Sequence, residues 1–241
     1  MTHVRWLVPL LFLAALAGAA CGGEDAIVSQ NVVAAIPWMA PETATYRILS
    51  DDKTVGSAEL RIEKQDASLK LTQDFHFPEK NFTNTSEVLV DANSLRPQSV
   101  RFAIDGPSGA LNCEAQYSGT RVEAHRTGED TERTDALDVP IGSYDSWGDL
   151  FLWRTLAFAA GYETRYSDIL SCTLDKTQNL GVTLKVKGKE TVQVPAGTFD
   201  TWRLEVRSGG ETQTAWYGVE TPHQLVRYDN GSNVFELDRP G

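Results

Sequence analysis

The sequence predicts an all-β fold, mainly antiparallel, arranged as a barrel-like or curved sheet of about 11–14 short strands with one buried α-helix near residues 145–160. Two observations predict this class. Short segments in which apolar and polar residues alternate recur from residue 43 to residue 237, as they do in half-buried strands. Turn-forming glycine, proline, asparagine and aspartate residues separate many of these segments, which is typical of barrels and sandwiches rather than of alternating strand and helix units.

The first two strands are predicted to form a hairpin. Ala44, Tyr46 and Ile48 alternate with polar residues, and the alternation resumes at residues 58–62 after an Asp-Asp-Lys turn at residues 51–53. The same pattern places further strands at residues 69–77, 87–90, 99–104, 111–117 and 121–125, and after the helix at residues 168–174, 182–186, 191–194, 201–206, 212–217, 224–228 and 234–237.

Three segments between these strands are predicted to be turns or loops. Gly188 is expected to separate two strands, and Pro195 and Gly197 in the motif VPAGTF indicate a tight turn between the strands at 191–194 and 201–206. Residues 128–138 form the most polar stretch and are predicted to be a long exposed loop. No linker of biased composition interrupts residues 41–241, so these are expected to form a single β-barrel-like domain.

One segment changes from the strand period to the helical period. Residues 145–160 carry large side chains at helical offsets, with Ser143 or Asp145 as the expected N-cap and Gly161 as the expected C-cap; the offsets fall at Trp147, Leu150, Phe151, Arg154 and Phe158. The segment is apolar nearly all round, so it is expected to be buried, either as a plain core helix or as one that grips a ligand. Arg154 then needs a partner, for which Asp145 and Asp149 are the local candidates.

The N-terminus is predicted to be an export signal. Residues 1–20 carry Arg5, an apolar run at residues 7–17 and then small residues, which is the pattern of a signal peptide and too short to span a bilayer. Cys21 follows the small residues, as in a bacterial lipobox, although the leucine usual three residues before the cysteine is replaced by Gly18. We expect acylation of Cys21, with residues 21–40 as a lipidated N-terminus and tether; the alternative is an ordinary signal peptide and a free thiol.

This signal predicts a cell-envelope lipoprotein, held by its N-terminal lipid on the outer face of the cytoplasmic membrane or on an outer membrane. The net charge of the chain argues against attachment to the membrane by electrostatic attraction. The chain has 22 Lys and Arg against 33 Asp and Glu, a formal net charge of -11. Such a surface repels phosphate backbones and anionic lipid headgroups, so nucleic acid is an unexpected partner.

The two other cysteines are predicted to form a disulfide. Cys113 shares a strand phase with Leu111 and Ala115, and Cys172 shares one with Leu170 and Leu174, so both thiols are expected to point inward. Pairing is the economical outcome in an exported chain, and it would contribute about 4 kcal/mol by the loop-entropy argument. The alternative is two buried free cysteines.

Catalytic and metal-binding motifs are not found in the sequence. The histidines His76, His125 and His223 lack the spacing of zinc ligands, and Ser108 and Ser208 lie in turn sequences without the frame of a nucleophile elbow. No Walker loop or dinucleotide fingerprint is present, and no cofactor is expected. Carboxylates are numerous, but a catalytic pair cannot be selected among them.

Large aromatic residues are the most notable side chains. They are predicted to line a cavity for an apolar or amphipathic small molecule or lipid; the candidates are Trp147, Phe151, Trp153, Trp202, Leu204 and Trp216. The alternative is that the rings simply fill a wide core. The first hypothesis is therefore a non-enzymatic carrier or binding protein, the second a structural or interaction module with a filled barrel, and the third an unrecognised hydrolase. A cavity of several hundred Å³ beside the helix would favour the first.

Three motifs together resemble a bacterial family of exported proteins whose defining domain has no known function. They are VPAGTF at residues 194–199 followed by Trp202 and Leu204, TAWYGVETPHQLVRYD at residues 214–229, and DSWGDLFLWRTLAFAAGYE at residues 145–163. The resemblance covers residues 43–237. It implies a β-barrel-like fold with a helix before its second half and a secreted or lipidated protein, and it supplies no catalytic residues.

Overall fold

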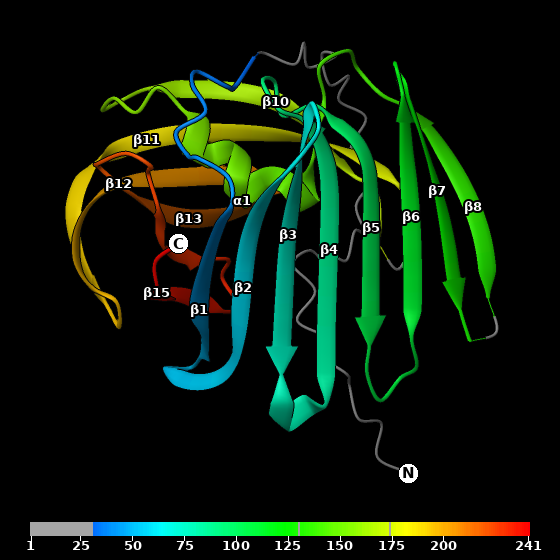
Figure 1. Cartoon of the computed structure of the whole chain (residues 1–241), viewed down its shortest axis with the longest axis horizontal. Helices are drawn as coiled ribbons and strands as arrows, with labels where there is room; N and C mark the ends of the chain where they lie inside the picture. The colour runs from blue at the N-terminus through cyan, green and yellow to red at the C-terminus, as the bar shows by residue number, and fades with distance from the viewer. Residues whose placement is uncertain (1–30, 130, 174) are drawn as a thin grey trace.

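The computed structural model describes residues 31–129, 131–173 and 175–241, and in these residues one sheet contains all fifteen strands (Figure 1). The sheet order is β8-β7-β6-β5-β4-β3-β2-β1-β15-β14-β13-β12-β11-β10-β9. The strands are β1 (Glu42–Ser50), β2 (Lys53–Gln65), β3 (Ser68–Phe77), β4 (Phe82–Asp91), β5 (Pro97–Asp105), β6 (Leu111–Ser118), β7 (Arg121–Gly128), β8 (Glu132–Asp138), β9 (Tyr144–Asp145), β10 (Glu163–Leu170), β11 (Gln178–Val194), β12 (Gly197–Ser208), β13 (Glu211–Gly218), β14 (Leu225–Asp229) and β15 (Val234–Arg239).

The predicted all-β, mainly antiparallel fold class is confirmed. Most neighbours in sequence pair as antiparallel hairpins, and β15 returns to pair with β1. Among the described residues, only the short β9 pairs in parallel, with β10. The β1–β2 turn forms because Asp51 and Asp52 adopt positive φ angles of 50° and 61°, as a two-residue hairpin turn requires. The predicted hairpin at VPAGTF also forms, between β11 and β12.

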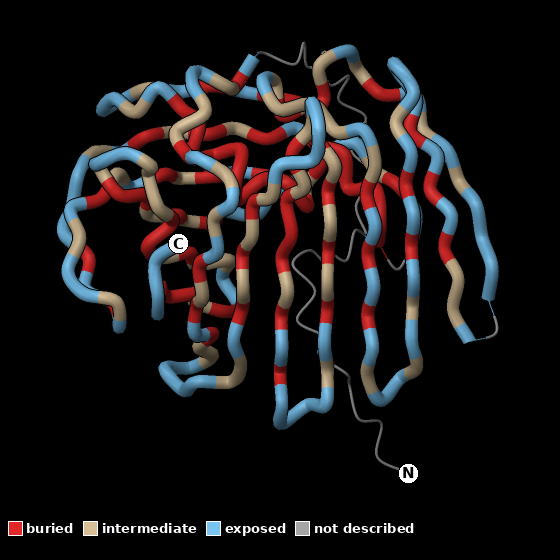
Figure 2. Tube along the Cα trace, viewed as in Figure 1, coloured by how far each residue is buried: buried red, intermediate tan, exposed pale blue. Residues whose placement is uncertain are grey.

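The sheet curls so that its two halves face each other. In Figure 1, β1–β8 run upright while β10–β13 cross behind and above them, and the helical segment lies between the two sets. Inward-facing residues alternate with exposed ones along the strands, as the red and blue bands in Figure 2 show. The core therefore lies between two crossing layers of a single curled sheet.

Several predicted element boundaries are wrong. Residues 128–138 are not a loop, because β8 occupies 132–138 and pairs with β7 along its length. Gly188 does not separate two strands: β11 runs through it with a bulge. With β8 and β9 added and two predicted strands joined into β11, the sheet has fifteen strands rather than about 11–14.

The buried helix is shorter than predicted. A 3-10 turn (Ser146–Gly148), α1 (Asp149–Leu152) and a second 3-10 turn (Trp153–Thr155) form what we call the helical segment, and Leu156 ends it in an extended conformation. Asp145 is the N-cap, since its side chain accepts a hydrogen bond from the amide of Trp147. Gly161 is not the C-cap, because it lies six residues beyond Thr155 in a separate turn.

The N-terminal segment joins the domain before β1. The amide of Ala34 donates to the carbonyl of Thr155, and Val32 and Trp38 are buried, so residues 31–40 pack on the helical segment rather than serving only as a tether. The predicted signal peptide, Cys21 and residues 21–30 lie outside the described residues. Within the described residues, no helix is long and apolar enough to cross a membrane.

Cross-links between the two margins of the sheet close the structure. The predicted disulfide is confirmed: Cys113 on β6 bonds to Cys172, just after β10, with 5.7 Å between their Cα atoms. Beside it, the Arg126 guanidinium on β7 donates to the carbonyls of Ser171 at 2.6 Å and Thr173 at 2.8 Å. These bonds hold the strands near the β8 edge against the segment that follows β10, near the β9 edge.

Candidate functional site

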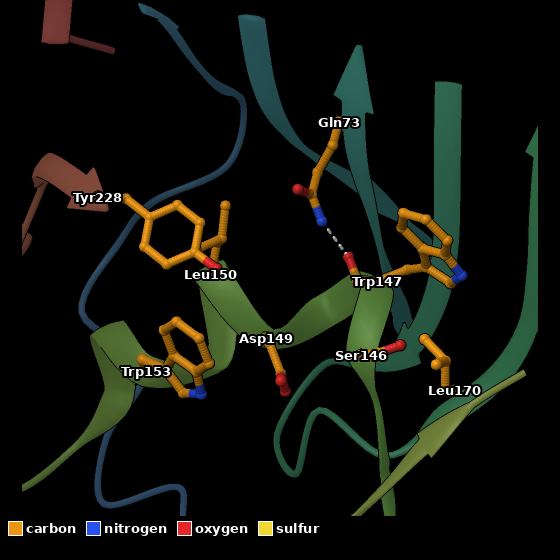
Figure 3. Close-up of a pocket in the computed structure, with 8 residues that line it drawn as sticks. All are labelled: Gln73, Ser146, Trp147, Asp149, Leu150, Trp153, Leu170 and Tyr228. Carbon is orange, nitrogen blue, oxygen red and sulfur yellow. Dashed lines mark hydrogen bonds between the residues drawn. The ribbon is translucent and has the colours of Figure 1, made fainter. Parts of the chain in front are cut away.

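The helical segment occupies the centre of the core, where the sequence placed its candidate ligand pocket (Figure 3). A cavity of about 20 Å³ lies beside it. The amide of Gln73 on β3 donates to the carbonyl of Trp147 and so fixes the start of the segment. The lining residues come from β3, the helical segment, β10 and β14; they are Gln73, Ser146, Trp147, Asp149, Leu150, Trp153, Leu170 and Tyr228.

This cavity is far too small for a lipid or a similar ligand. A volume of about 20 Å³ admits a water molecule, whereas ligand pockets begin at roughly 300 Å³. A second cavity on the other side of the segment, against Leu71, Val88 and Leu152, has about 10 Å³. The core around the segment is therefore filled by side chains.

Three of the predicted pocket residues lie in this filled core. The Trp147 ring stacks on Phe102 with 4.4 Å between ring centroids, and Trp147 lines the small cavity. Trp153 also lines it, and its ring N–H donates to the hydroxyl of Tyr166 at 2.9 Å. Phe151 is 1% exposed and packs into the core without lining that cavity.

The other three predicted pocket residues lie elsewhere. Leu204 on β12 is fully buried. Trp202 stacks on Phe158 with 6.2 Å between ring centroids, and the Lys189 ammonium lies over the Trp202 ring. Trp216 is on the outward face of β13, where its ring N–H donates to Glu190. The six residues do not meet around one space.

Three buried carboxylates lie in or beside the helical segment instead: Asp145, Asp149 and Asp168, which are 3%, 5% and 0% exposed. Asp145 accepts hydrogen bonds from the Tyr117 hydroxyl at 2.5 Å and from the Trp147 amide at 3.0 Å. Asp149 accepts one from the Tyr166 hydroxyl at 2.7 Å. Neither oxygen of Asp168 accepts a well-formed hydrogen bond within the described residues.

Burial changes the protonation of this cluster. It raises the pKa of Asp145 to about 6, and burial together with the neighbouring carboxylates raises the pKa of both Asp149 and Asp168. Burial also raises the pKa of the Tyr117 and Tyr166 hydroxyls, which therefore remain neutral donors. No group of three or more histidine, cysteine or carboxylate side chains is placed to hold a metal ion among the described residues.

Arg154 is paired, but not with either predicted partner. Its guanidinium makes two hydrogen bonds to Glu42 on β1, at 2.5 and 3.1 Å, and a third to the carbonyl of Pro222 at 3.0 Å. Both side chains are buried, at 4% and 9% exposure. Asp145 and Asp149 accept hydrogen bonds from tyrosine hydroxyls instead. Glu42 lies 112 residues from Arg154 in sequence, so a search among neighbouring residues does not find it.

A much larger hollow than the two cavities beside the helical segment lies on the outside of the sheet. It has a volume of about 590 Å³ and lies over the outward face of β1–β4 and the end of β15; we call it the outer groove. Its rows of paired residues are polar, because the apolar residues of the same strands point to the core. Its polar lining residues are Thr45, Arg47, Thr54, Ser57, Glu59, Asp74, His76, Thr83, Thr85, Asp238 and Arg239. Tyr46, Gly56, Ala58 and Phe75 also line it.

A comparison with family models identifies the chain. Residues 38–238 match the family described as Protein of unknown function (DUF3108). The chain belongs to this family. A search of curated proteins found no match. This confirms one part of the resemblance seen in the sequence, namely that the chain belongs to a family of unknown function.

One solved structure resembles the DUF3108 domain in fold, and a second matches it only weakly. A β-barrel-like protein of the domain of unknown function DUF1849 from Brucella abortus has a TM-score of 0.52 and 11% identity, over 86% of this chain and 97% of that one. A protein described as exported, with a YmcC-like fold, from Bacteroides fragilis has a TM-score of 0.28 and 9% identity, over 86% of this chain and 98% of that one. Only the first supports a shared fold, and neither supports a shared activity.

The buried carboxylates of the DUF3108 domain were missed by the sequence reasoning, although one signal for them exists. Asp168 falls on the same strand phase as Tyr166 and Leu170, so a carboxylate interrupts an inward-facing row. The outer groove gave no such signal. Its residues read as the ordinary solvated side of several strands, and their grouping depends on how those strands are placed in space.

Proposed function

We propose that this DUF3108 protein is a non-enzymatic cell-envelope lipoprotein that serves as an interaction module, with the outer groove as its binding surface for a polar segment of a partner protein. One observation supports this choice over a carrier. The hollow of about 590 Å³ lies outside the sheet, whereas the cavities beside the helical segment hold about 20 and 10 Å³. The space that could hold part of another molecule is therefore on the surface and not in the core.

The charged and hydroxyl side chains of the outer groove support a partner protein that carries matching polar groups. Arg47 is held by Glu236 at 2.6 Å, and Asp74 accepts from the Thr85 hydroxyl at 2.7 Å and pairs with Arg61 at 2.6 Å. These ordered charges and hydroxyls can match the polar side chains and backbone of an extended segment, and they cost free energy if an apolar molecule covers them.

Site-specific cross-linking in cells tests the binding surface. A photoreactive amino acid is placed at Ser57 or Thr83, two exposed positions in the outer groove, and at Gln116, an exposed outward position on β6. We expect Ser57 and Thr83 to form the same protein adduct and Gln116 to form none. Equal adducts at all three positions, or none at any, would overturn the proposal.

Native mass spectrometry tests the alternative of a carrier. The chain with Cys21→Ser, which removes the proposed acylation site, is purified without detergent extraction. We expect the mass of the protein alone, because the core has no room for a lipid. A bound lipid in equimolar amount would restore the carrier hypothesis and overturn ours.

The proposed lipid anchor has its own measurement. Cells grown with labelled palmitate should incorporate the label into the wild-type chain, and Cys21→Ser should abolish the incorporation. The variants Cys113→Ala and Cys172→Ala keep Cys21 and should retain the label. Incorporation into the Cys21→Ser chain would show that the acyl group is elsewhere.

A further inference from the structure

A basic face lies on the outside of the second half of the sheet. We define it as Arg165 on β10, Lys185 and Lys187 on β11, and Arg207 on β12, which surround a hollow of about 150 Å³ together with Glu163 and Glu205. All four cationic side chains are at least 40% exposed. Four cations therefore face solvent around two carboxylates.

The two carboxylates are shared, so the basic face keeps an excess of positive charge. Glu163 is 3.3 Å from Lys185 and 3.9 Å from Arg165. Glu205 is 3.3 Å from Lys187 and 2.8 Å from Arg207. Each carboxylate neutralises only one of its two cations, and the remaining donors are available to an anion.

The far edge of the sheet, formed by β6–β8, has the opposite sign. The outward positions of β6–β8 carry Glu114, Glu123, Glu132 and Asp138, with Arg121 as their one lysine or arginine in the described residues. Charges in physiological salt are felt over about 8–10 Å, so a surface meeting the basic face responds to that face rather than to the net charge of the whole chain. The net charge of -11 therefore does not exclude an anionic partner at this location.

The N-terminal chain enters the domain next to the same strands. The Tyr144 hydroxyl on β9 donates to the Asn31 side chain at 3.3 Å, and Tyr144 pairs with Asp168 on β10, the strand that carries Arg165. In Figure 1 the first described residues (blue) begin close to β10. Nine residues lie between Cys21 and Asn31, so the ten steps from one Cα atom to the next span at most about 36 Å.

We propose that the basic face is the membrane-facing side of the domain and that it binds the headgroups of anionic phospholipids. This inference rests on the proposed anchoring through Cys21, which would keep β9 and β10 within a short distance of the bilayer. A phosphate headgroup matches the clustered guanidinium and ammonium groups. In this orientation the outer groove, on the other half of the sheet, stays accessible to a partner.

Vesicle binding tests the proposal without the anchor. The chain with Cys21→Ser is mixed with vesicles of phosphatidylcholine alone or of phosphatidylcholine with phosphatidylglycerol, and the bound fraction is measured by sedimentation. We expect binding to the anionic vesicles only. This binding should be lost at about 0.5 M salt, because salt shortens the range of the electrostatic attraction. Absence of a preference for anionic vesicles at low salt would overturn the proposal.

Matched charge reversals locate the binding. Lys185→Glu with Lys187→Glu should lower the partition onto anionic vesicles by about tenfold or more. Arg101→Glu with Arg121→Glu, on β5 and β7, makes the same change in net charge and should leave the partition within about twofold. Equal losses in the two double variants would show a net-charge effect and would overturn the assignment to the basic face.

Two further measurements keep the result interpretable. Lys185→Gln with Lys187→Gln should give an intermediate partition, and the unfolding transition of each variant shows whether the fold is intact. The cross-linking at Ser57 and Thr83 does not depend on these lysines. Failure of vesicle binding with intact cross-linking would therefore reject the membrane-facing surface alone, and the reverse result would reject the outer groove alone.

Discussion

Asp145 shows how one side chain can serve both local structure and the core. It caps the helical segment through the Trp147 amide and accepts the Tyr117 hydroxyl from β6, so it joins the segment to the sheet. These bonds stabilise its ionised form, but complete burial has the larger effect, and the pKa of Asp145 rises to about 6. Asp149 and Asp168, whose pKa values are also raised, lie in the same region.

The raised pKa of Asp145 predicts that stability falls as pH rises. Between about pH 4, the unfolded pKa, and about pH 6, the native state binds the proton more tightly than the unfolded state, so the free energy of unfolding declines with increasing pH. A shift of about two units corresponds to a loss on the order of 3 kcal/mol, complete above pH 6. Denaturant titrations at about pH 4.5 and 7.5 should show a smaller decline in Asp145→Asn than in the wild type.

Asp138→Asn is the matched control for this pH dependence. Asp138 is an aspartate on β8 with an 84% exposed side chain, so removing its charge should leave the decline unchanged. An equal decline in the wild type and in Asp145→Asn would contradict the assignment to Asp145.

The Arg154–Glu42 pair gives a second prediction at this scale. Glu42→Gln leaves a buried guanidinium without its counter-charge, and breaking such a pair costs about 3–5 kcal/mol of unfolding free energy. Arg121→Gln removes the cation from the Arg121–Asp138 pair, whose side chains are 55% and 84% exposed, and should cost about 1 kcal/mol or less. Denaturant unfolding measures both variants, and equal costs would contradict the importance of burial.

The helical segment shows what the apolar periodicity predicts correctly and where it fails. Trp147, Leu150, Phe151 and Arg154 belong to the segment at the predicted offsets. Phe158 fits the same period but lies beyond the helix, because its ring packs on Trp202 and on His223, 5.0 Å away. A tertiary contact thus overrides local propensity at the C-terminal end.

Strand β11 supplies a prediction at the scale of the element. Gly188 has a φ of +148° and produces the bulge that lets one strand continue where the sequence indicated a turn. Nothing lies within 4 Å of an added Cβ, so Gly188→Ala should be destabilising through backbone strain alone, by about 1–2 kcal/mol. Thermal unfolding measures this, with Lys187→Ala as the neighbouring control; a neutral Gly188→Ala would show that the bulge relaxes without strain.

At the scale of the molecule, the sequence predicts the class of fold but not its closure. Alternation identifies the inward face of each strand, and together with the expected export it predicted the pairing of Cys113 with Cys172. The alternation of apolar and polar residues contains no information on which strands face each other across the core. For that reason the Arg154–Glu42 pair, the outer groove and the uneven distribution of charge emerge only from the three-dimensional arrangement.

Closure of the sheet depends on the bonds between its two margins, and this predicts where the molecule opens first. Replacing both Cys113 and Cys172 by alanine should lower the free energy of unfolding by about 2–4 kcal/mol. Amide hydrogen exchange should increase most in β6–β8 and in residues 171–173 and 175–177, because the hydrogen bonds of Arg126 and Asp135 are then the main ties between them, while β1–β3 stay protected by pairing on both sides. The Cys21→Ser chain, with the disulfide intact, is the control. An increase spread evenly over all strands would mean that the sheet opens as one unit and that the disulfide does not act locally.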